Sequence, residues 1–368
     1  MVLQHLPARE KGDWTVKTHI EPGIDSMNYT GPLSAAQKDA VLSELKKRAG
    51  FQKNCGDYFE EYYHYSSDCF ADQGVKIQIE KTAKTPWRIS LIVHPTLVLG
   101  EKDRSKLWQP TKKSFRAMEN ALVSKLKKVQ LDLPPETLSL SRVDVTADLE
   151  FDDAALVTEY LRIIKKSRIL PHYKTDWFKE KDGKARDCRE ANRHSYKQCC
   201  KHGALFAYDK TAQLQMIDRL PNALIGKRIL RIEAQLRRKG ILKWVPAAAC
   251  SSSRDIIHTL FKKGKKIIRW YLRRMQPADT PCRRYETAVA QAQAIRGEKT
   301  RTRILYLLKK ASDCHDLDTA LEKTASHFDL NRRKQKSLLK ACNKKKINPI
   351  TLTNSGAYEE LPPLSALL

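Results

Sequence analysis

Three stretches of the chain alternate apolar and polar residues with a period of two, the pattern of a β-strand with one packed face. They span residues 138–149, 200–210 and 228–238. Two further runs, 75–80 and 87–93, predict an antiparallel pair joined through Thr85-Pro86. Apolar residues at helical spacing instead mark residues 34–50, 114–129 and 152–164. This mixture predicts an α+β fold with a largely antiparallel sheet flanked by helices.

The polar faces of two of these strands carry carboxylates among cations. In residues 138–149, Asp144 and Asp148 share a face with Arg142, and in residues 228–238 Glu233 shares a face with Arg231. Two carboxylates in one row repel each other unless a cation lies between them. A divalent ion held by oxygen ligands is one explanation, and the neighbouring basic side chains are another.

The strand predicted over residues 200–210 carries a tyrosine. Tyr208 shares one face with His202 upstream and Lys210 downstream. A phenol, an imidazole and an ammonium group on one face suit phosphodiester chemistry, although a half-buried tyrosine in an ordinary strand has the same pattern. For Tyr196 we favour a structural or DNA-contact role, and a role as second nucleophile at termination is the alternative.

The chain is strongly basic. Its 368 residues include 69 Lys and Arg against 42 Asp and Glu, a formal net charge of +27. The excess is spread along the chain, which indicates a polyanionic partner. No apolar run is long enough to span a bilayer and the first residues do not resemble a signal peptide, so we expect a cytoplasmic protein without membrane contact. The nine cysteines lack framework spacing and are expected to be reduced thiols. A zinc site among Cys188, His194, Cys199, Cys200 and His202 is a weaker possibility.

We expect four regions along the chain. Residues 1–70 form an N-terminal helical and aromatic segment, 71–245 a catalytic domain, 246–347 a basic helical DNA-binding region, and 348–368 a loosely ordered tail. Within the third region, residues 301–310, 317–328 and 331–342 predict three helices, which suit either a helix-turn-helix or a plain bundle with a basic face. The expected DNA contacts are Arg142, Arg231, Lys265, Lys266, Arg269, Arg273, Arg332, Arg333 and Lys334.

Three motifs in this order resemble the gene II/X replication initiators of filamentous phages and related plasmids. The motifs are Ser141-Arg142-Val143-Asp144-Val145-Thr146, Ala204-Leu205-Phe206-Ala207-Tyr208-Asp209-Lys210 and Leu230-Arg231-Ile232-Glu233-Ala234-Gln235-Leu236. The resemblance covers roughly residues 75–245. It implies a nicking-and-joining enzyme in which Tyr208 is the nucleophile, with His202 and Lys210 beside it.

The resemblance also implies how such an enzyme works. Tyr208 would form a 5′-phosphotyrosyl link and leave a 3′-hydroxyl primer, and the reverse attack would rejoin the displaced strand. A Mg²⁺ or Mn²⁺ ion would lower the cost of ionising the phenol. Many rolling-circle initiators hold their metal through a His-hydrophobic-His motif, which this sequence lacks, so the ligands are drawn from Asp144, Glu233, Asp148 and His202, with the first two preferred.

The expected partners are double-stranded origin DNA, displaced single-stranded DNA, and a host helicase and polymerase. Two other interpretations stay open. One is a DNA- or RNA-binding protein without enzymatic activity, and the other is a relaxase or transposase with the same tyrosine chemistry.

Overall fold

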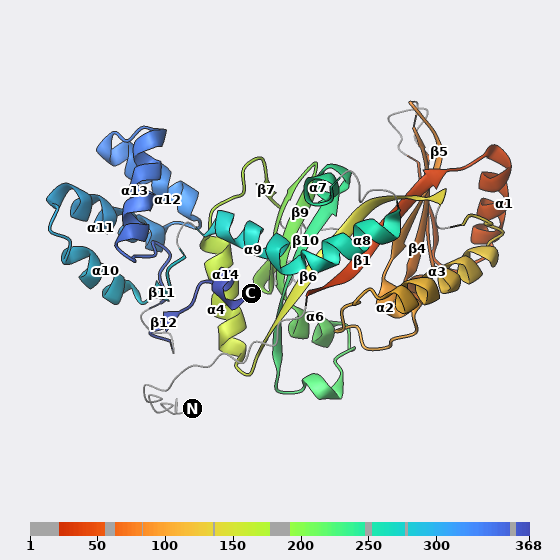
Figure 1. The fold of residues 1–368 in the computed structure, drawn as a ribbon, viewed down its shortest axis with the longest axis horizontal. Helices are drawn as coiled ribbons and strands as arrows, with labels where there is room; N and C mark the ends of the chain where they lie inside the picture. The colour runs from red at the N-terminus through yellow and green to blue at the C-terminus, as the bar shows by residue number, and fades with distance from the viewer. Residues whose placement is uncertain are drawn as a thin grey trace.

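The structure is a computed structural model that describes residues 22–55, 63–82, 84–134, 137–176, 192–246, 252–276, 279–353 and 358–368. It is an α+β fold in which a ten-stranded antiparallel sheet carries helices and is followed by a largely helical C-terminal region (Figure 1). The predicted fold class is confirmed. No helix among these residues has the length and apolar character needed to cross a membrane.

The sheet has the strand order β2-β3-β4-β5-β1-β6-β10-β9-β8-β7. Its strands are β1 (Pro22–Pro32), β2 (Phe51–Cys55), β3 (Tyr63–Phe70), β4 (Val75–Thr82), β5 (Thr85–Val93), β6 (Ser139–Phe151), β7 (Lys174–Thr175), β8 (Ser195–Cys200), β9 (Gly203–Asp209) and β10 (Arg228–Arg237). The three alternating stretches are β6, β9 and β10, with β10 hydrogen-bonded between the other two. Residues far apart in the sequence therefore meet at the centre of the sheet.

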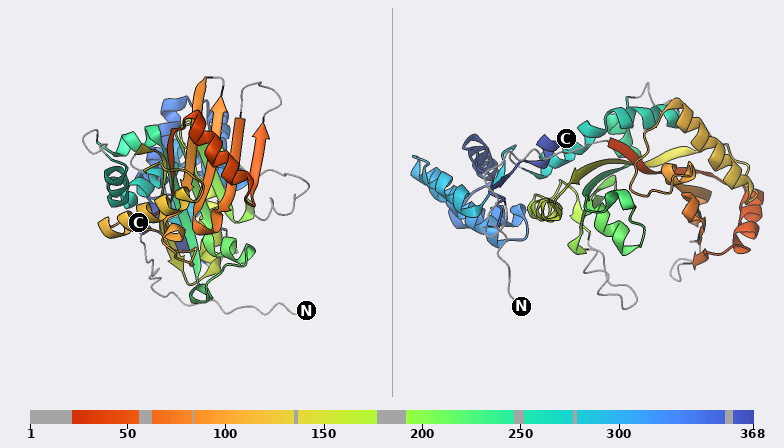
Figure 2. Two further views of the ribbon diagram at one scale, coloured as in Figure 1. Left: turned by 90° about the vertical axis from the view of Figure 1, so that its right-hand side faces the viewer. Right: turned by 90° about the horizontal axis from the view of Figure 1, so that it is seen from below.

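Helices cover the outer side of the curved sheet, and α6 lies on its inner side (Figure 2). The helices beside the sheet are α1 (Ala35–Lys46), α2 (Pro95–Val98), α3 (Lys112–Lys127), α4 (Ala154–Lys166), α6 (Lys210–Met216), α7 (Arg238–Trp244), α8 (Ser253–Lys262) and α9 (Gly264–Met275). The C-terminal region contains α10 (Tyr285–Gln293), α11 (Glu298–Asp313), α12 (Leu317–Phe328), α13 (Arg332–Lys344) and α14 (Leu364–Leu367), with a short pair of strands, β11 (Cys282–Arg283) and β12 (Glu360–Leu361). The three helices predicted there are α11, α12 and α13.

The two faces of β6 have different surroundings. Val143, Val145 and Ala147 are fully buried on the side of the helices. Helix α9 begins there at Gly264, where a Cβ atom would lie only 2.9 Å from Pro22 Cβ of β1, so the glycine allows the helix to pack close to the sheet. Because side chains alternate along a strand, the charged residues of β6 face the inner side of the sheet.

The region boundaries differ from the expected ones in two places. Strand β1 lies between β5 and β6, so residues 22–55 contribute to the sheet rather than forming a separate segment. In the described part of the tail, β12 pairs with β11, the Tyr358 hydroxyl donates a hydrogen bond to Asp153, and Leu364 is fully buried. These residues are packed against the rest of the protein, contrary to the prediction of a loose tail.

Candidate active site

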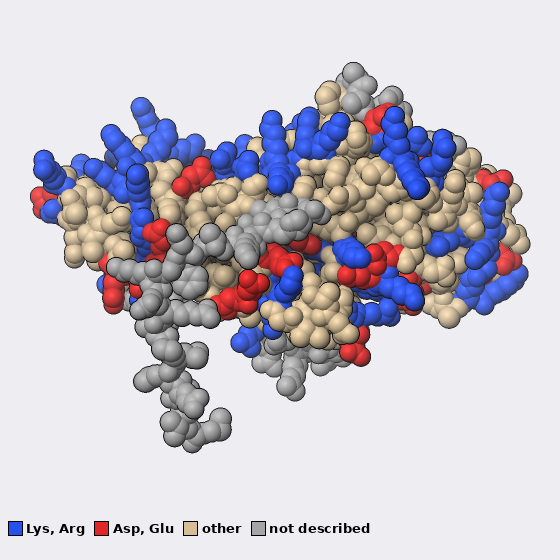
Figure 3. All heavy atoms as spheres, turned by 60° about the horizontal axis from the view of Figure 1, so that its bottom comes forward, with Lys and Arg blue, Asp and Glu red and all other residues tan. Residues whose placement is uncertain are grey.

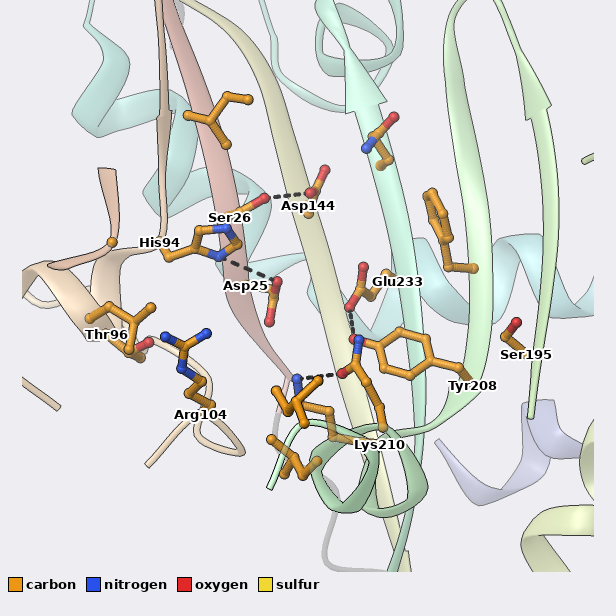
Figure 4. A pocket seen from close by; sticks show the side chains of 18 of the residues that line it. Asp25, Ser26, His94, Thr96, Arg104, Asp144, Ser195, Tyr208, Lys210 and Glu233 are labelled. Carbon is orange, nitrogen blue, oxygen red and sulfur yellow. Dashed lines mark hydrogen bonds and ion pairs between the residues drawn. The ribbon is translucent and has the colours of Figure 1, made fainter. Parts of the chain in front are cut away.

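A cavity of about 700 Å³ opens on the inner face of the sheet (Figure 4). Its lining comes from the central strands, from α6, and from the segments on either side of α2. Cations on the α2 side include Lys76, Arg104 and Lys106. Tyr208 and Glu233, which the sequence singled out, both line this cavity.

Tyr208 and Glu233 are in direct contact. The Tyr208 hydroxyl donates a short hydrogen bond to Glu233 Oε1. Burial raises the pKa of Tyr208 well above its usual value of 10, and the Glu233 carboxylate adds to the rise. Burial, together with the charges of Asp25 and Asp144, raises the pKa of Glu233 to about 8. A carboxylate with so high a pKa accepts a proton from a phenol more readily than an ordinary carboxylate does.

A β-bulge in β1 brings two further polar residues to this site. Between Ile24 and Met27, β1 has two residues where β6 has only Asp144. These two residues are Asp25 and Ser26, and both line the cavity. The sequence analysis missed them because β1 was not predicted.

Asp144 is held by neighbours on its own face. Ser26 Oγ donates a hydrogen bond of 2.5 Å to Asp144 Oδ2, and Arg142 Nη2 approaches the same oxygen at 2.8 Å. Burial raises the pKa of Asp144 in spite of the Arg142 charge. Asp144 Oδ1 is buried without a hydrogen-bond partner among the described residues. This oxygen is therefore available to a ligand.

Arg231 lies under the tyrosine and is completely buried. Its guanidinium donates to both oxygens of Asp148 at 2.7 Å and to Asp25 Oδ1 at 2.8 Å. Bidentate pairs of this kind fix geometry as well as charge. The prediction that Arg231 contacts DNA is wrong, because none of its surface is accessible. Asp148 is likewise occupied by Arg231, which leaves it a poor candidate for a metal ligand.

Lys210 lies beside the tyrosine, but on a different element from the one predicted. Asp209 caps the N-terminus of α6 by accepting a hydrogen bond from Ala212 N, so Lys210 begins a helix rather than ending the strand. Its Nζ lies 5.9 Å from the centre of the Tyr208 ring and donates to Gln213 Oε1 at 2.9 Å. Burial, with Arg231 adding to it, lowers the pKa of Lys210 to about 8.

His202 is not part of this site. Residues 201–202 form the two-residue turn between β8 and β9, since Cys200 pairs with Gly203. At about 3.3 Å per residue, the turn lies about 20 Å along the strand from Tyr208. His202 therefore cannot assist Tyr208 or share a metal ion with it, and its predicted role is corrected.

His94 is in the cavity instead. Its Nδ1 lies 3.9 Å from Asp25 Oδ2, across the cavity from the tyrosine (Figure 4). The sequence analysis assigned His94 no role. Burial of Asp25 opposes its ionisation, but Arg231 and Lys210 outweigh that effect and its pKa is lowered.

Tyr196 borders the cavity, but its side chain lies on the opposite face of the sheet from Tyr208. It pairs with Ala207 on β9, whose side chain faces opposite to that of Tyr208. Its hydroxyl accepts a hydrogen bond of 2.9 Å from Gln198 Nε2, and its side chain is buried. The alternative of a structural role fits this position better than a second nucleophile does.

The described residues contain no group of three His, Cys, Asp or Glu side chains that could hold a metal ion. Of the zinc candidates, Cys188 lies outside the described residues. Cys199 Sγ contacts Asp176 Oδ2 at 3.8 Å, whereas Cys200 accepts a hydrogen bond from His202 N, so these two cysteines have separate surroundings. Asp144 and Glu233 remain as oxygen donors at the cavity, and the unpartnered Asp144 Oδ1 fits a cation bound partly through substrate oxygens.

A second group of cations lies outside the cavity. Lys and Arg side chains line one edge of the molecule in Figure 3, over the C-terminal helices and the helices outside the sheet. The predicted DNA contacts that are exposed are Lys265, Lys266 and Arg273 on α9, and Arg332, Arg333 and Lys334 on α13. Arg269 is half-buried and donates to Ser365 O at 3.2 Å. Arg142 is bound to Asp144 at the cavity.

No protein-family model matches the chain, and a search of curated proteins finds no match either. The chemistry of the site therefore has to be argued from its geometry alone.

Proposed function

We propose that the protein nicks and rejoins one strand of DNA through Tyr208, as a rolling-circle replication initiator of the gene II/X kind. The observation that carries the proposal is the hydrogen bond from the Tyr208 hydroxyl to Glu233 in an open cavity. A nucleophilic hydroxyl paired with a proton acceptor is the arrangement that covalent catalysis requires. Lys210 supplies positive charge next to it.

The step follows from these contacts. Glu233 takes the phenol proton, the Tyr208 oxygen forms a bond to phosphorus, and the bond from phosphorus to the 3′-oxygen breaks. The leaving 3′-oxygen takes a proton from water in the open cavity. Lys210 stabilises the charge that develops on the phosphoryl oxygens. In the reverse reaction a 3′-hydroxyl returns its proton to the solvent and forms a bond to phosphorus, while the bond from phosphorus to the Tyr208 oxygen breaks. The Tyr208 oxygen recovers its proton from Glu233, and the strand is closed.

A Mg²⁺ or Mn²⁺ ion belongs to the proposal. Mg²⁺ is commonly held by one or two carboxylates together with substrate phosphate oxygens, and Asp144 would supply such a carboxylate while Glu233 stays free to take the phenol proton. When bound, the ion would polarise a phosphoryl oxygen as a Lewis acid. Asp148 is left out of the ligand set because Arg231 occupies both of its oxygens.

Arg231 has a positioning role in this account. It lies directly across from Tyr208 in the β9–β10 ladder, and it is held by Asp148 and Asp25. Its charge opposes the rise in the Tyr208 pKa that burial causes. The buried ion pairs thus fix a positive charge beneath the nucleophile.

Supercoiled DNA carrying the protein's own replicon tests the proposal. Incubation with Mg²⁺ or Mn²⁺ is expected to give open circles and a protein–DNA adduct that resists SDS, and EDTA is expected to suppress both. Binding of the DNA without nicking under any of these conditions would contradict the proposal. That outcome would favour a nucleic-acid-binding protein without activity, for which the exposed cations of α9 and α13 are the supporting observation. A relaxase or transposase would differ in the DNA that it cleaves.

A further inference from the structure

An aromatic side chain lies next to the candidate nucleophile inside the cavity. Phe206 precedes Tyr208 by two residues on β9, so both side chains face the same way. Both line the cavity, and Phe206 is only partly buried. The two Cα atoms are about 7 Å apart along the strand. A base stacked on Phe206 can therefore belong to the nucleotide whose phosphate lies at Tyr208.

The strands on either side of Phe206 supply polar groups. Across the β8–β9 ladder, Lys197 places its Nζ 5.2 Å from the centre of the Phe206 ring. On the other side Phe206 pairs with Glu233, and Gln235 is the next residue of β10 on the same face. Gln235 also lines the cavity. Its side-chain amide has a donor and an acceptor side by side, which matches the edge of adenine.

The mouth of the cavity is also apolar. Met216 and Ile217, at the end of α6, line it with side chains 55% and 50% exposed. Large apolar side chains exposed beside a charged site are typical of a binding surface. Sites for single-stranded nucleic acid combine cations that bind the phosphates with aromatic and apolar side chains on which the unpaired bases stack. The bases of an intact duplex are stacked on one another and have no free face to offer.

We propose that Phe206 and Gln235 form a subsite for one unstacked base of a single DNA strand, next to the phosphate that Tyr208 attacks. Phe206 stacks on the base and Gln235 contacts its edge. The inference rests on the proposed function for the identity of that phosphate. Binding of the base itself can be measured without any nicking, which separates the two proposals.

Binding is measured with fluorescein-labelled oligonucleotides by anisotropy, in protein that also carries Tyr208→Phe so that no covalent step interferes. Phe206→Leu is expected to weaken binding of a single strand about ten-fold, in line with the usual loss for one stacked base, while Phe206→Tyr keeps most of it. Phe51→Leu is the matched control, because Phe51 is a half-buried aromatic residue on β2, outside the cavity. Duplex binding is expected to change little in any of these variants.

A second measurement uses wild-type protein, so its main result does not depend on whether a variant folds correctly. An oligonucleotide carrying a single iododeoxyuridine is bound to wild-type protein and irradiated, and the cross-linked peptide is identified by mass spectrometry. We expect a cross-link in residues 203–209, and we expect Gln235→Ala to reduce the preference for adenine over the other bases. Unchanged affinity in correctly folded Phe206→Leu protein, or cross-links only outside the cavity, would overturn the subsite. If these binding effects are found but wild-type protein forms no adduct, the subsite stands and the nicking function fails.

Discussion

The Tyr208 hydroxyl donates a hydrogen bond to Glu233 although the two residues are not partners in the β9–β10 ladder. Tyr208 pairs with Arg231, and Glu233 pairs with Phe206. The contact is thus diagonal, a reach that an aromatic side chain can make across two strands. The same geometry places the phenol between a proton acceptor and a buried guanidinium.

Glu233→Gln removes the proton acceptor while keeping the size of the side chain. The rate at which the SDS-resistant adduct forms is expected to fall by about 10²–10⁴, the usual contribution of a positioned base. Glu150→Gln is a suitable control, because Glu150 forms an ion pair with Lys227, which lies just before β10. An adduct that forms at the wild-type rate in Glu233→Gln would exclude Glu233 as the base.

The rate of adduct formation should have a bell-shaped dependence on pH with its maximum near pH 8. Below that pH Glu233 is protonated and cannot accept the phenol proton, since its pKa is raised to about 8. Above it Lys210 loses its charge, since its pKa is lowered to about 8. Because Glu233 and Lys210 interact, the two pKa values read from the limbs of the pH profile belong to the pair and not to either residue alone. The measurement is the rate at subsaturating DNA between about pH 6 and about pH 10.

Asp25→Asn should move this profile to lower pH. The negative charge of Asp25 raises the pKa of both Glu233 and Lys210, so its removal lowers both. Asp39→Asn is the control, because Asp39 is an exposed carboxylate paired with Lys38 on α1, outside the cavity. If Asp25→Asn left both limbs in place, the assignment of the limbs to this pair would be wrong.

Arg231→Met should destabilise the fold far more than the removal of an ordinary surface pair. It leaves the half-buried carboxylates of Asp148 and Asp25 without the fully buried guanidinium that pairs with them, and breaking a buried pair costs about 3–5 kcal/mol in typical cases. Arg254→Met breaks the exposed pair with Glu119 and is expected to cost at most about 1 kcal/mol. Urea denaturation of both variants measures the difference. Equal free energies of unfolding would show that the Arg231 pairs are not structural.

The basic N-terminus of α13 should bind phosphates without reading sequence. Replacing Arg332, Arg333 and Lys334 with alanine is expected to weaken binding to any duplex and to lower the slope of log K against log salt by about 0.9 for each phosphate that is no longer neutralised. Alanine at the exposed residues Lys46, Lys53 and Lys84 removes the same charge elsewhere. If the two triple variants had the same slope, net charge rather than α13 would account for binding.

The sheet could be predicted where one face of a strand packs and the other is polar. Strands β6, β9 and β10 follow that pattern. Asp144, Tyr208 and Glu233 were grouped in one site through the resemblance of their three motifs to one family, and the pairing of β10 with both β6 and β9 is what brings them together. Strand β1 could not be found in this way, because it begins and ends with proline and is buried on both faces along part of its length. Asp25 was missed together with β1, because a β-bulge interrupts the alternation of apolar and polar residues and leaves no sequence pattern of its own.

The ends of β9 were the other source of error. The period-two pattern continues through His202 and Lys210, but the first lies in a turn and the second in a helix. Asp209 was the available signal, because an aspartate before Lys-Thr-Ala-Gln is a good helix cap. Nothing in the alternation itself marks the turn, so His202 was assigned to a site about 20 Å from where it lies.

The most direct test of the account is to map the covalent link itself. Protein incubated with single-stranded DNA of its replicon and Mg²⁺ or Mn²⁺ is digested with protease and nuclease, and the peptide that carries a nucleotide is sequenced by mass spectrometry. The account predicts a phosphotyrosyl bond at Tyr208, absent from Tyr208→Phe and present in Tyr196→Phe. An adduct at another residue, or one that persists in Tyr208→Phe, would contradict it.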